Sequence, residues 1–502
     1  MSDTTLYRPP APTPSSPLRS LLRVIRQGDG DLLSLVPEEA YRKPLTWLGY
    51  SRRSILLIND TEICRSVLYD KEGIFPKNDL MVGALEGLVG NSLFVSSGDT
   101  WKRQRQMIDP AFSQLRINTA FASMVSAIDD YQTVLDDCAE KQSEFSLDKA
   151  MSHLTADIIC RTIFSQPLSS DIAGDVFKDF LLFERSVASV DLKQLIFGKP
   201  WARINQPAPV VAACHRIRDH IGTMLDPRLK PNTSAVQATN QDANQHANQD
   251  LNQDLNQATH QHANQHANQH THQADKHSDD IVAAIIAARD EQTGKPFTRE
   301  ELIDQIGVFF LAGHETTASV LTWVFFILSQ QPEVAKRIAV DVERVTGGDD
   351  VKLEHLRHMP YVRNVFREVL RLYPPITFLP RVALQHTHIA NKRVKRGAMI
   401  MISPWTAHRN ALLWNNADRF DPDRFNTQAT DKGTHLSFGI GPRVCIGASF
   451  ATTEATLIIA RLAQRYTFEC MNTDTVRPVA RLTTRPAHEI QMTIKHRTKS
   501  GS

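Results

Sequence analysis

The residue with the clearest chemical potential is a single cysteine in a glycine-rich loop. Cys445 stands in the stretch SFGIGPRVCIGASFA, with no second cysteine nearby and a helix-like pattern directly after it. Backbone N–H groups at a helix start lack partners within the helix, and with the helix dipole they stabilise a thiolate. Gly439 and Gly441 let the loop turn tightly beside a flat ligand, and Gly447 keeps the first helical turn slim. Such a lone thiolate suits the axial ligand of a haem iron.

A second candidate site interrupts an apolar segment. Residues 312–317 read AGHETT, within a stretch whose second half is apolar on nearly every side, so this helix should be buried. Polar side chains there are costly unless they have partners or a chemical role. Gly313 removes a side chain where O2 would need space, and Thr316 can bond the carbonyl four residues earlier and open the helix slightly.

The helix that carries AGHETT has clear boundaries in the sequence. Thr298 and Glu301 form a capping box, Phe297 and Leu302 can pack as a hydrophobic staple, and Pro332 ends the helix. A second helix is predicted in YVRNVFREVLRLY, before two prolines. Strand patterns such as GAMIMIS are short and lie mostly in the C-terminal half. The predicted fold is therefore mainly α with small β-sheets.

Composition and charge exclude several classes of protein. The chain has 502 residues and a net charge of +2, which argues against broad nucleic-acid binding. Its six cysteines contain no CxxC pair, so neither a disulfide framework nor a zinc site is expected. We expect the protein to work in a reducing compartment. No stretch reaches the roughly 18 apolar residues expected of a membrane span, and the polar, Pro-rich start lacks the apolar core of a secretory signal.

These observations predict a cytoplasmic monomer with no transmembrane span. The alternative is a mitochondrial protein, because the segment LRSLLRVIRQ near the start is basic and amphipathic and contains no acidic residue. Residues 1–40 are interpreted as a flexible tail and a pre-domain segment, and residues 41–495 as one large domain.

An insert interrupts this domain at residues 231–279. Its core repeats with a period of four and is rich in Asn, Gln, His and Ala, so it cannot bury enough apolar surface to offset its ordering entropy. We expect it to be disordered. If it were helical instead, His262, His266 and His270 would share one face and could bind a metal ion.

The loop around Cys445 resembles the haem-binding loop of the cytochrome P450 family. The family pattern F-x-x-G-x-R-x-C-x-G is matched without a gap. The matching residues are Phe438, Gly441, Arg443, Cys445 and Gly447. The resemblance implies the cytochrome P450 fold and a haem b, iron protoporphyrin IX, bound through Cys445 as the axial ligand of the iron.

Two further motifs follow in the family's order. EVLR contributes Glu368 and Arg371 on one helix face, and FDPDRF contributes Arg424. The resemblance implies that these three residues form a buried structural network behind the haem. Removing one partner of such a network strands a buried charge.

The resemblance also implies a set of contacts to the haem propionates. WKRQR is similar to the family's W-x-x-x-R, in which Trp101 and Arg105 would bind a propionate. Arg443, two residues before the ligand, and Arg381 in FLPR would supply the other contacts. A guanidinium suits a carboxylate through charge-assisted hydrogen bonds.

AGHETT is similar to the family's A-G-x-[DE]-T-[TS]. The resemblance implies that Thr316 hydrogen-bonds the bound O2 and that Glu315 helps relay protons from solvent, which is general acid catalysis through a water chain. His314 is expected to face outward or to be hydrogen-bonded, because the family varies at this position.

The predicted substrate pocket is mostly apolar. A loop at about residues 81–93 should line it, together with helix and loop residues near the haem. These residues are Phe309, Ala312, Thr377 and Phe378. Such a lining suits a small hydrophobic substrate.

The predicted function is a haem-thiolate monooxygenase that activates O2 and hydroxylates, or otherwise oxidises, this substrate. The haem supplies the oxidation, and the protein supplies binding and proton delivery. The chain has no flavin or iron–sulfur signature, so the reducing equivalents of NAD(P)H must arrive through partners. The soluble bacterial type, with ferredoxin and ferredoxin reductase, is expected. Lys102, Arg103 and Arg105, where exposed, would attract an acidic ferredoxin.

Two alternatives stay open at this point. One is a peroxide-driven peroxygenase or an isomerase that uses the same haem without redox partners; a Glu315–Thr316 relay argues against it. The other is a non-catalytic haem or metal sensor, with the His-rich insert as its metal-binding tail.

Overall fold

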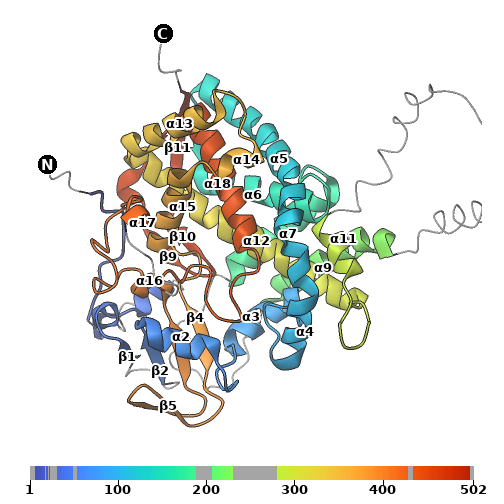
Figure 1. Cartoon of the computed structure of the whole chain (residues 1–502), viewed down its shortest axis with the longest axis vertical. Helices are drawn as coiled ribbons and strands as arrows, with labels where there is room; N and C mark the ends of the chain where they lie inside the picture. Colours follow the sequence, from blue (N-terminus) through green and yellow to red (C-terminus); the bar gives the residue numbers. More distant parts are fainter. Residues whose placement is uncertain are drawn as a thin grey trace, which may run out of the picture.

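The computed structural model describes most of the chain. Most helices pack into one body, and strands β1, β2, β4 and β5 lie together at its lower left (Figure 1). The described residues are 6–16, 18–20, 22, 31–48, 54–77, 79–187, 206–229, 280–427 and 434–497. The predicted insert, with its three histidines, lies outside them.

The helices account for most of the described residues. The α-helices are α2 (Thr61–Tyr69), α3 (Asp79–Val89), α4 (Gly98–Ile108), α5 (Gln114–Lys141), α6 (Leu147–Ile163), α7 (Asp171–Val187), α9 (Ala208–Leu229), α11 (Ile281–Ala287), α12 (Arg299–Gln330), α13 (Pro332–Thr346), α14 (Leu353–Leu356), α15 (Pro360–Leu372), α16 (Pro404–Ala407), α17 (Arg424–Thr427) and α18 (Ala448–Arg465). The 3-10 helices are η1 (Leu32–Leu35), η2 (Glu38–Tyr41), η3 (Asp109–Phe112) and η4 (Thr473–Thr475).

The strands form four small sheets. They are β1 (Leu45–Leu48), β2 (Ile55–Ile58), β3 (Phe145–Ser146), β4 (Leu379–Val382), β5 (Thr387–Ile389), β6 (Lys392–Val394), β7 (Met399–Ile402), β8 (Tyr466–Cys470), β9 (Pro478–Ala480), β10 (Thr484–Pro486) and β11 (Gln491–His496). The largest sheet has the order β1-β2-β7-β4, in which only β2 and β7 are parallel. The others are β3-β11-β8 and the pairs β9/β10 and β5/β6. The mainly α fold with small sheets is confirmed, and GAMIMIS supplies β7.

Helix α12 runs through the centre of the molecule and starts where the sequence predicts. The Thr298 hydroxyl accepts from the N–H of Glu301 at 3.2 Å, and the Glu301 carboxylate accepts from the N–H of Thr298 at 2.8 Å. The helix is continuous to Gln330, so the expected opening at AGHETT is wrong. The Thr316 side chain bonds a backbone carbonyl without interrupting the helix.

Helix α12 is unusually apolar, and most of it is buried. Among the described residues, α12 alone is long and apolar enough to cross a membrane, which the sequence-based search for an apolar stretch missed. However, 83% of its most apolar stretch is buried inside the protein. Its closest neighbour is α6, which packs along it. We therefore assign α12 to the core.

Residues 81–93, expected as a loop, are mostly helical. Helix α3 covers the first part and buries Leu85, Leu88 and Val89, which have helical spacing. Two glycines, Gly83 and Gly87, disrupt the apolar pattern in the sequence and concealed the helix, because glycine lowers helix propensity.

Residues 6–16, within the segment expected to be a flexible tail, are hydrogen-bonded to the domain. Residues 6–16 lie against the loop before α17: the Tyr7 carbonyl accepts from the N–H of Phe420 at 2.9 Å. Tyr373, at the end of α15, donates its hydroxyl to the Pro10 carbonyl at 2.6 Å. Proline-rich backbone leaves its carbonyls free to accept, so this segment can act as a strap.

Candidate active site

The loop before α18 holds Cys445 in a defined geometry. The N–H of Cys445 donates to the Phe438 carbonyl at 2.8 Å, which closes the loop. Gly441 has φ of +77°, and a Cβ there would lie 3.0 Å from the Leu68 carbonyl oxygen, so no other residue fits. Gly447 is the N-cap of α18, and its Cβ position lies 4.0 Å from the Cys445 sulfur. Gly441 therefore lets the loop pack against the backbone at Leu68, whereas a Cβ at Gly447 would make only an ordinary contact with the sulfur.

Cys445 is exposed to solvent, but many protein atoms lie close around its thiol and oppose its ionisation. Burial by the surrounding chain raises the pKa of Cys445, while the backbone N–H of Gly447 and the charge of Arg105 lower it in part. The donors expected at the helix start are present, but they do not outweigh desolvation. A bound metal ion would supply the missing positive charge, because a coordinating thiol is deprotonated outright.

Three cations gather beside this loop. Lys77 pairs with Arg381 in an isolated antiparallel bridge, and both lie close enough to Arg443 for their charges to interact. Burial, together with the other two cations, holds the pKa of Lys77 well below its usual value. Burial also lowers the pKa of Arg381 and of Arg443, each to about 10.

These cations lack matching anions among the described residues. Asp70 is the one carboxylate that interacts with Arg381 and Arg443, and its oxygens accept from backbone N–H groups of Ile74 and Phe75 at 2.8 and 3.0 Å. One Arg443 nitrogen, Nη1, is buried with no hydrogen-bond partner. Like charges held together out of water are unfavourable unless a ligand compensates them. A ligand with two carboxylates, as haem has, fits this cluster.

Lys77 is a site residue that the sequence motifs missed. Its ammonium donates to the Phe94 carbonyl and lies 3.8 Å from the centre of the Phe94 ring. No motif surrounds it, and only the strand pairing that brings it to Arg381 reveals its place.

Trp101 and Arg105 lie on α4, next to the same loop. The Arg443 guanidinium stacks over the Trp101 ring at 4.5 Å. Arg105 donates to the Val444 carbonyl at 2.8 Å and pairs with Asp109 at 2.6 Å. Both predicted residues therefore border the Cys445 loop, and Arg105 also ties α4 to it.

The predicted docking patch for a ferredoxin is smaller than expected. Arg103 pairs with Glu301 at the start of α12, and its side chain is 28% exposed. Arg105 is 19% exposed because it turns toward the Cys445 loop. Of the three predicted cations, Lys102 alone remains largely exposed, at 68%, beside Asp99.

Helix α12 is open at one place in its middle. From Leu302 to Leu328 every residue is buried except Ala312, Gly313 and Thr316. Thr316 donates its hydroxyl to the Ala312 carbonyl at 2.7 Å. The open part of α12 therefore coincides with the motif that the sequence singled out.

Gly313 has a different role from the one expected. A Cβ at this position would lie 2.6 Å from Cδ1 of Ile159 on α6. The glycine therefore allows α6 and α12 to pack closely, because a side chain here would clash with α6. The expectation that it makes space for O2 is wrong.

The predicted relay carries protons from solvent, but the Glu315 side chain does not itself reach solvent. Its side chain is 6% exposed and forms a two-point ion pair with Arg485 of β10, and the Thr483 hydroxyl also donates to it. Burial alone would raise the pKa of Glu315, but the charge and hydrogen bonds of Arg485 outweigh burial and lower it. Arg485 and Thr483 are further residues that the sequence did not reveal, because they lie far along the chain.

His314 is fully buried, so an outward-facing position is wrong. Its Nδ1 lies 3.0 Å from the Phe310 carbonyl, and its Nε2 lies 3.1 Å from a carboxylate oxygen of Glu184 on α7.

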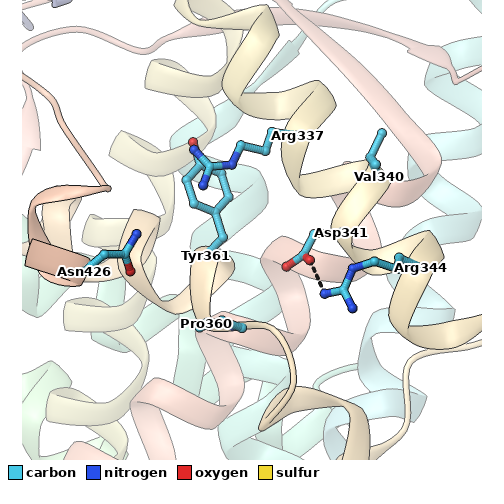
Figure 2. A pocket seen from close by; sticks show the side chains of 7 residues that line it. All are labelled: Arg337, Val340, Asp341, Arg344, Pro360, Tyr361 and Asn426. Atoms are coloured by element: carbon cyan, nitrogen blue, oxygen red, sulfur yellow. Dashed lines mark hydrogen bonds and ion pairs between the residues drawn. The ribbon is translucent and has the colours of Figure 1, made fainter.

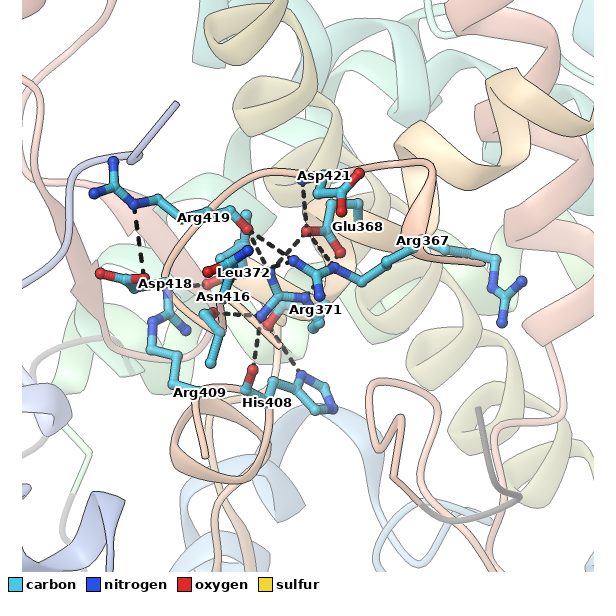
Figure 3. Close-up of polar contacts among 12 residues, drawn as sticks. Arg367, Glu368, Arg371, Leu372, His408, Arg409, Asn416, Asp418, Arg419 and Asp421 are labelled. Atoms are coloured by element: carbon cyan, nitrogen blue, oxygen red, sulfur yellow. Dashed lines mark hydrogen bonds and ion pairs between the residues drawn. The ribbon is translucent and has the colours of Figure 1, made fainter. Parts of the chain in front are cut away.

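The Glu368 network is buried, and Figure 3 shows Glu368 and Arg371 with the backbone groups around them. Glu368 accepts from Arg371 at 2.7 and 2.8 Å and from Arg424 at 3.0 Å. Arg371 also donates to the carbonyl of His408 at 2.7 Å. The His408 ring accepts from the N–H of Leu436 at 2.7 Å. This chain of bonds connects the network to the residues that lead into the Cys445 loop.

The predicted pocket residues are divided between two places. Phe309 packs against Phe112 with tilted rings whose centres lie 5.1 Å apart, one turn from the open Ala312. Phe378 instead packs in the hydrophobic cluster beneath the largest sheet. The carbonyl of Thr377 accepts from the Ser403 hydroxyl at 3.1 Å, and its side chain is buried.

A separate surface pocket of about 280 Å³ lies between α13, α15 and α17 (Figure 2). It is lined by Arg337, Val340, Asp341, Arg344, Pro360, Tyr361 and Asn426. None of the predicted site residues lines it, so it is not the catalytic site.

Comparison with known proteins agrees with this geometry. The family described as cytochrome P450 matches residues 9–494. The chain is 27% identical to the cyclooctat-9-en-7-ol 5-monooxygenase of Streptomyces melanosporofaciens over 90% of this chain and 84% of that protein. It is 26% identical to a cytokinin hydroxylase of Arabidopsis thaliana over 90% of this chain and 80% of that protein. The crystal structure of the cytochrome P450DA haem domain superposes with a TM-score of 0.73 at 19% identity, over 98% of both chains.

Proposed function

The chain belongs to the cytochrome P450 family and is a monooxygenase, and we propose that it oxidises a small, largely hydrocarbon substrate beside a haem held by Cys445. The observation that carries this proposal is the cluster of Lys77, Arg381 and Arg443, whose positive charges lack anions at the edge of the Cys445 loop.

The residues that would hold the haem surround this loop. Cys445 would bind the iron, and the three cations with Trp101 would bind the propionates through charge-assisted hydrogen bonds. Haem supplies the activation of O2. Arg105, which ties α4 to the loop, would keep the thiolate in place and contribute positive charge near it.

We propose that the hydroxyl oxygen of Thr316, in the open part of α12, accepts a hydrogen bond during proton delivery. Its hydroxyl donates to the Ala312 carbonyl, so its oxygen lone pairs can accept a hydrogen bond from the open side. Thr316→Val keeps the shape and removes this oxygen. We expect less product for each O2 consumed, with more peroxide.

A matched control for Thr316 exists on the same helix. Thr322 donates to the Ala318 carbonyl at 2.8 Å in the same way, but it is fully buried in the core. Thr322→Val should leave the ratio of product to O2 unchanged. If the ratio of product to O2 is the same in both variants and in the wild type, Thr316 has no role in proton delivery.

The substrate is proposed to be a terpene-like hydrocarbon. Two observations support this class: the open stretch of α12 is bordered by the apolar Phe309, and the name of one relative specifies cyclooctat-9-en-7-ol. Terpenes, steroids and fatty acids should be compared by the spin-state shift that each causes in the haem spectrum. Ala312→Phe should abolish the shift, whereas Leu412→Phe, at a position that is 85% exposed, should not.

We further propose that a soluble ferredoxin and its reductase supply electrons to a monomer in the cytoplasm. The exposed Lys102 supports an acidic partner. Reduction by ferredoxin should slow as salt is added, because exposed charges are screened. Salt-independent reduction would contradict this partner, and turnover with peroxide but not with ferredoxin would indicate a peroxygenase.

A further inference from the structure

Helix α7 presents one face to α12 at the active site. Phe177, Phe180 and Glu184 follow one another at helical spacing on α7. The rings of Phe177 and Phe180 lie edge-on to His314, with ring centres 5.9 and 6.1 Å away, and Phe310 packs at 5.1 Å. His314 is therefore enclosed by aromatic rings, and Glu184 is the polar side chain that α7 brings to it.

The hydrogen-bond partners of His314 fix where its protons lie. A carbonyl can only accept, so Nδ1 must carry the hydrogen that faces the Phe310 carbonyl at 3.0 Å. Nε2 lies 3.1 Å from Oε1 of Glu184. Both of these atoms are buried and have no other partner among the described residues. Two bare lone pairs at this distance would repel, so a proton must lie between them.

We propose that Glu184 and His314 share one proton, and that this pair is a positioning device that links α7 to the neighbouring acid Glu315. The pair is neutral with the proton present, whether it lies on the histidine or on the carboxyl group. Loss of the proton leaves a negative charge beside Glu315.

The charges around the pair support a bound proton. Burial alone would lower the pKa of His314, but Glu184 outweighs burial, and the pKa is raised. Burial raises the pKa of Glu184, and Glu315 raises it further. The other charged groups that face the cluster are Arg485 from β10 and, next to Arg485, Asp148 from α6. With one shared proton, the pair adds no net charge to the Glu315–Arg485 ion pair.

A metal ion is a poorer explanation of the same residues. Ligand atoms of Glu184, His314 and Glu315 lie within 4.8 Å of one another. However, both Glu315 oxygens already bind the Arg485 guanidinium, which would repel a cation. The proton satisfies the two buried atoms that have no partner without disturbing that ion pair.

The shared proton predicts a specific dependence of stability on pH. Separate groups would have pKa values of 4.5 and 6.5, so the unfolded chain binds one proton between these values, as the folded pair does. Above pH 6.5 the unfolded chain releases its proton while the folded pair keeps it, and the stabilisation falls as pH rises. The contribution is therefore fully present below pH 6.5 and is lost as pH rises above it.

Glu184→Gln tests this, because a glutamine amide can donate to Nε2 and preserve both the contact and the neutrality. We expect the stability of wild type relative to E184Q to fall as pH rises above 6.5 in urea unfolding of the holoenzyme. Above pH 6.5 the unfolding constant of the wild type should rise relative to E184Q, up to tenfold for each unit by which folding raises the His314 pKa. The control is D175N on the same helix, because Asp175 is exposed and pairs with Lys178. A profile of E184Q that parallels wild type and D175N would overturn the proposal.

A second variant and a second measurement complete the test. His314→Gln removes the histidine of the pair, so this variant should lose the fall in stability above pH 6.5. If its stability still falls in that range, the proposal is wrong. The role in catalysis rests on the proposed function of Glu315. Product formed per O2 consumed should therefore change with pH above 6.5 in the wild type and not in E184Q. Unfolding that behaves as expected, with an unchanged product ratio, would reject only the link to Glu315.

Discussion

Two groups of buried charge in this molecule differ in one respect. Glu368 receives hydrogen bonds from two arginines, and those arginines donate their remaining N–H groups to backbone carbonyls. In the cluster of Lys77, Arg381 and Arg443, the two arginines interact with a single carboxylate, Asp70, that is already bonded to backbone, and one Arg443 nitrogen has no partner. The first group is complete within the chain, and the second is not.

The difference shows how to separate structural charges from ligand-binding charges. A complete network contributes to the fold and has no capacity for a ligand. An incomplete cluster costs stability until a ligand arrives, and the attraction of its cations to an anionic ligand then offsets their mutual repulsion. Mutations in the two groups should therefore have opposite effects on the protein without haem.

The largest effect is expected from Glu368→Gln. This change leaves Arg371 and Arg424 buried without a counter-charge, which costs roughly 3–5 kcal/mol. Urea unfolding of the protein with and without haem should show the loss in both forms. Glu354→Gln, an exposed position on α14, is the control. If E368Q is as stable as the control, Glu368 is not needed to balance the buried charges of Arg371 and Arg424.

Protonation of His435, beside the complete Glu368 network, should also lower the stability of the protein. Burial lowers the pKa of His435 to about 4 from 6.5, despite its bond to the Arg367 carbonyl. The unfolded chain therefore binds more protons between these values, so stability is fully present above pH 6.5 and is lost as pH falls toward 4. The loss is up to about 3 kcal/mol, at about 1.4 kcal/mol per pKa unit.

His435→Gln provides the comparison for this pH effect. The variant should unfold with a weaker dependence on acid between pH 6.5 and 4, whatever its stability at neutral pH. A wild-type stability that stays constant over this interval would contradict the assignment of a neutral, buried His435.

A smaller effect of opposite sign is expected from Lys77→Met. Methionine preserves much of the shape and removes one of three mutually repelling charges, so the haem-free protein should be at least as stable as wild type. The holoprotein should lose haem about tenfold faster to an acceptor protein, which corresponds to about 1.4 kcal/mol. Lys71→Met, at an exposed position, is the control. If Lys77→Met destabilises the haem-free protein and leaves the rate of haem loss unchanged, Lys77 is a structural charge.

The smallest effect concerns the strap that covers the loop next to the complete network. Tyr373→Phe removes the bond to the Pro10 carbonyl and should cost about 1 kcal/mol in urea unfolding. Because the same loop supplies the Arg419 carbonyl to Arg371, Tyr373→Phe and Glu368→Gln should be non-additive in the double variant. Additive effects would show that the strap and the network are independent.

Local patterns predicted some elements well. The start of α12 follows from a capping box within four residues, because cap and partner are neighbours in the chain. The Cys445 loop follows from glycines whose φ angles only glycine adopts readily. Each of these signals depends on residues close in sequence, so no knowledge of the tertiary structure is needed.

Contacts between distant segments could not be predicted in this way. Arg485 reaches Glu315 across 170 positions, and Glu184 reaches His314 from another helix. Neither pair leaves a local pattern, because their meeting depends on how α7 and the β9/β10 pair pack on α12. The role of Gly313 was misjudged for the same reason: the identity of its neighbour, Ile159, is a property of helix packing.

The most direct test of the central claim is the spectrum of the reduced holoprotein under carbon monoxide. With Cys445 as the ligand, the wild type and Cys138→Ala, a half-buried cysteine elsewhere, should both show the strongly red-shifted Soret band of thiolate coordination, and Cys445→Ala should lose it. The same band in Cys445→Ala, or its absence from the wild type, would contradict coordination by Cys445.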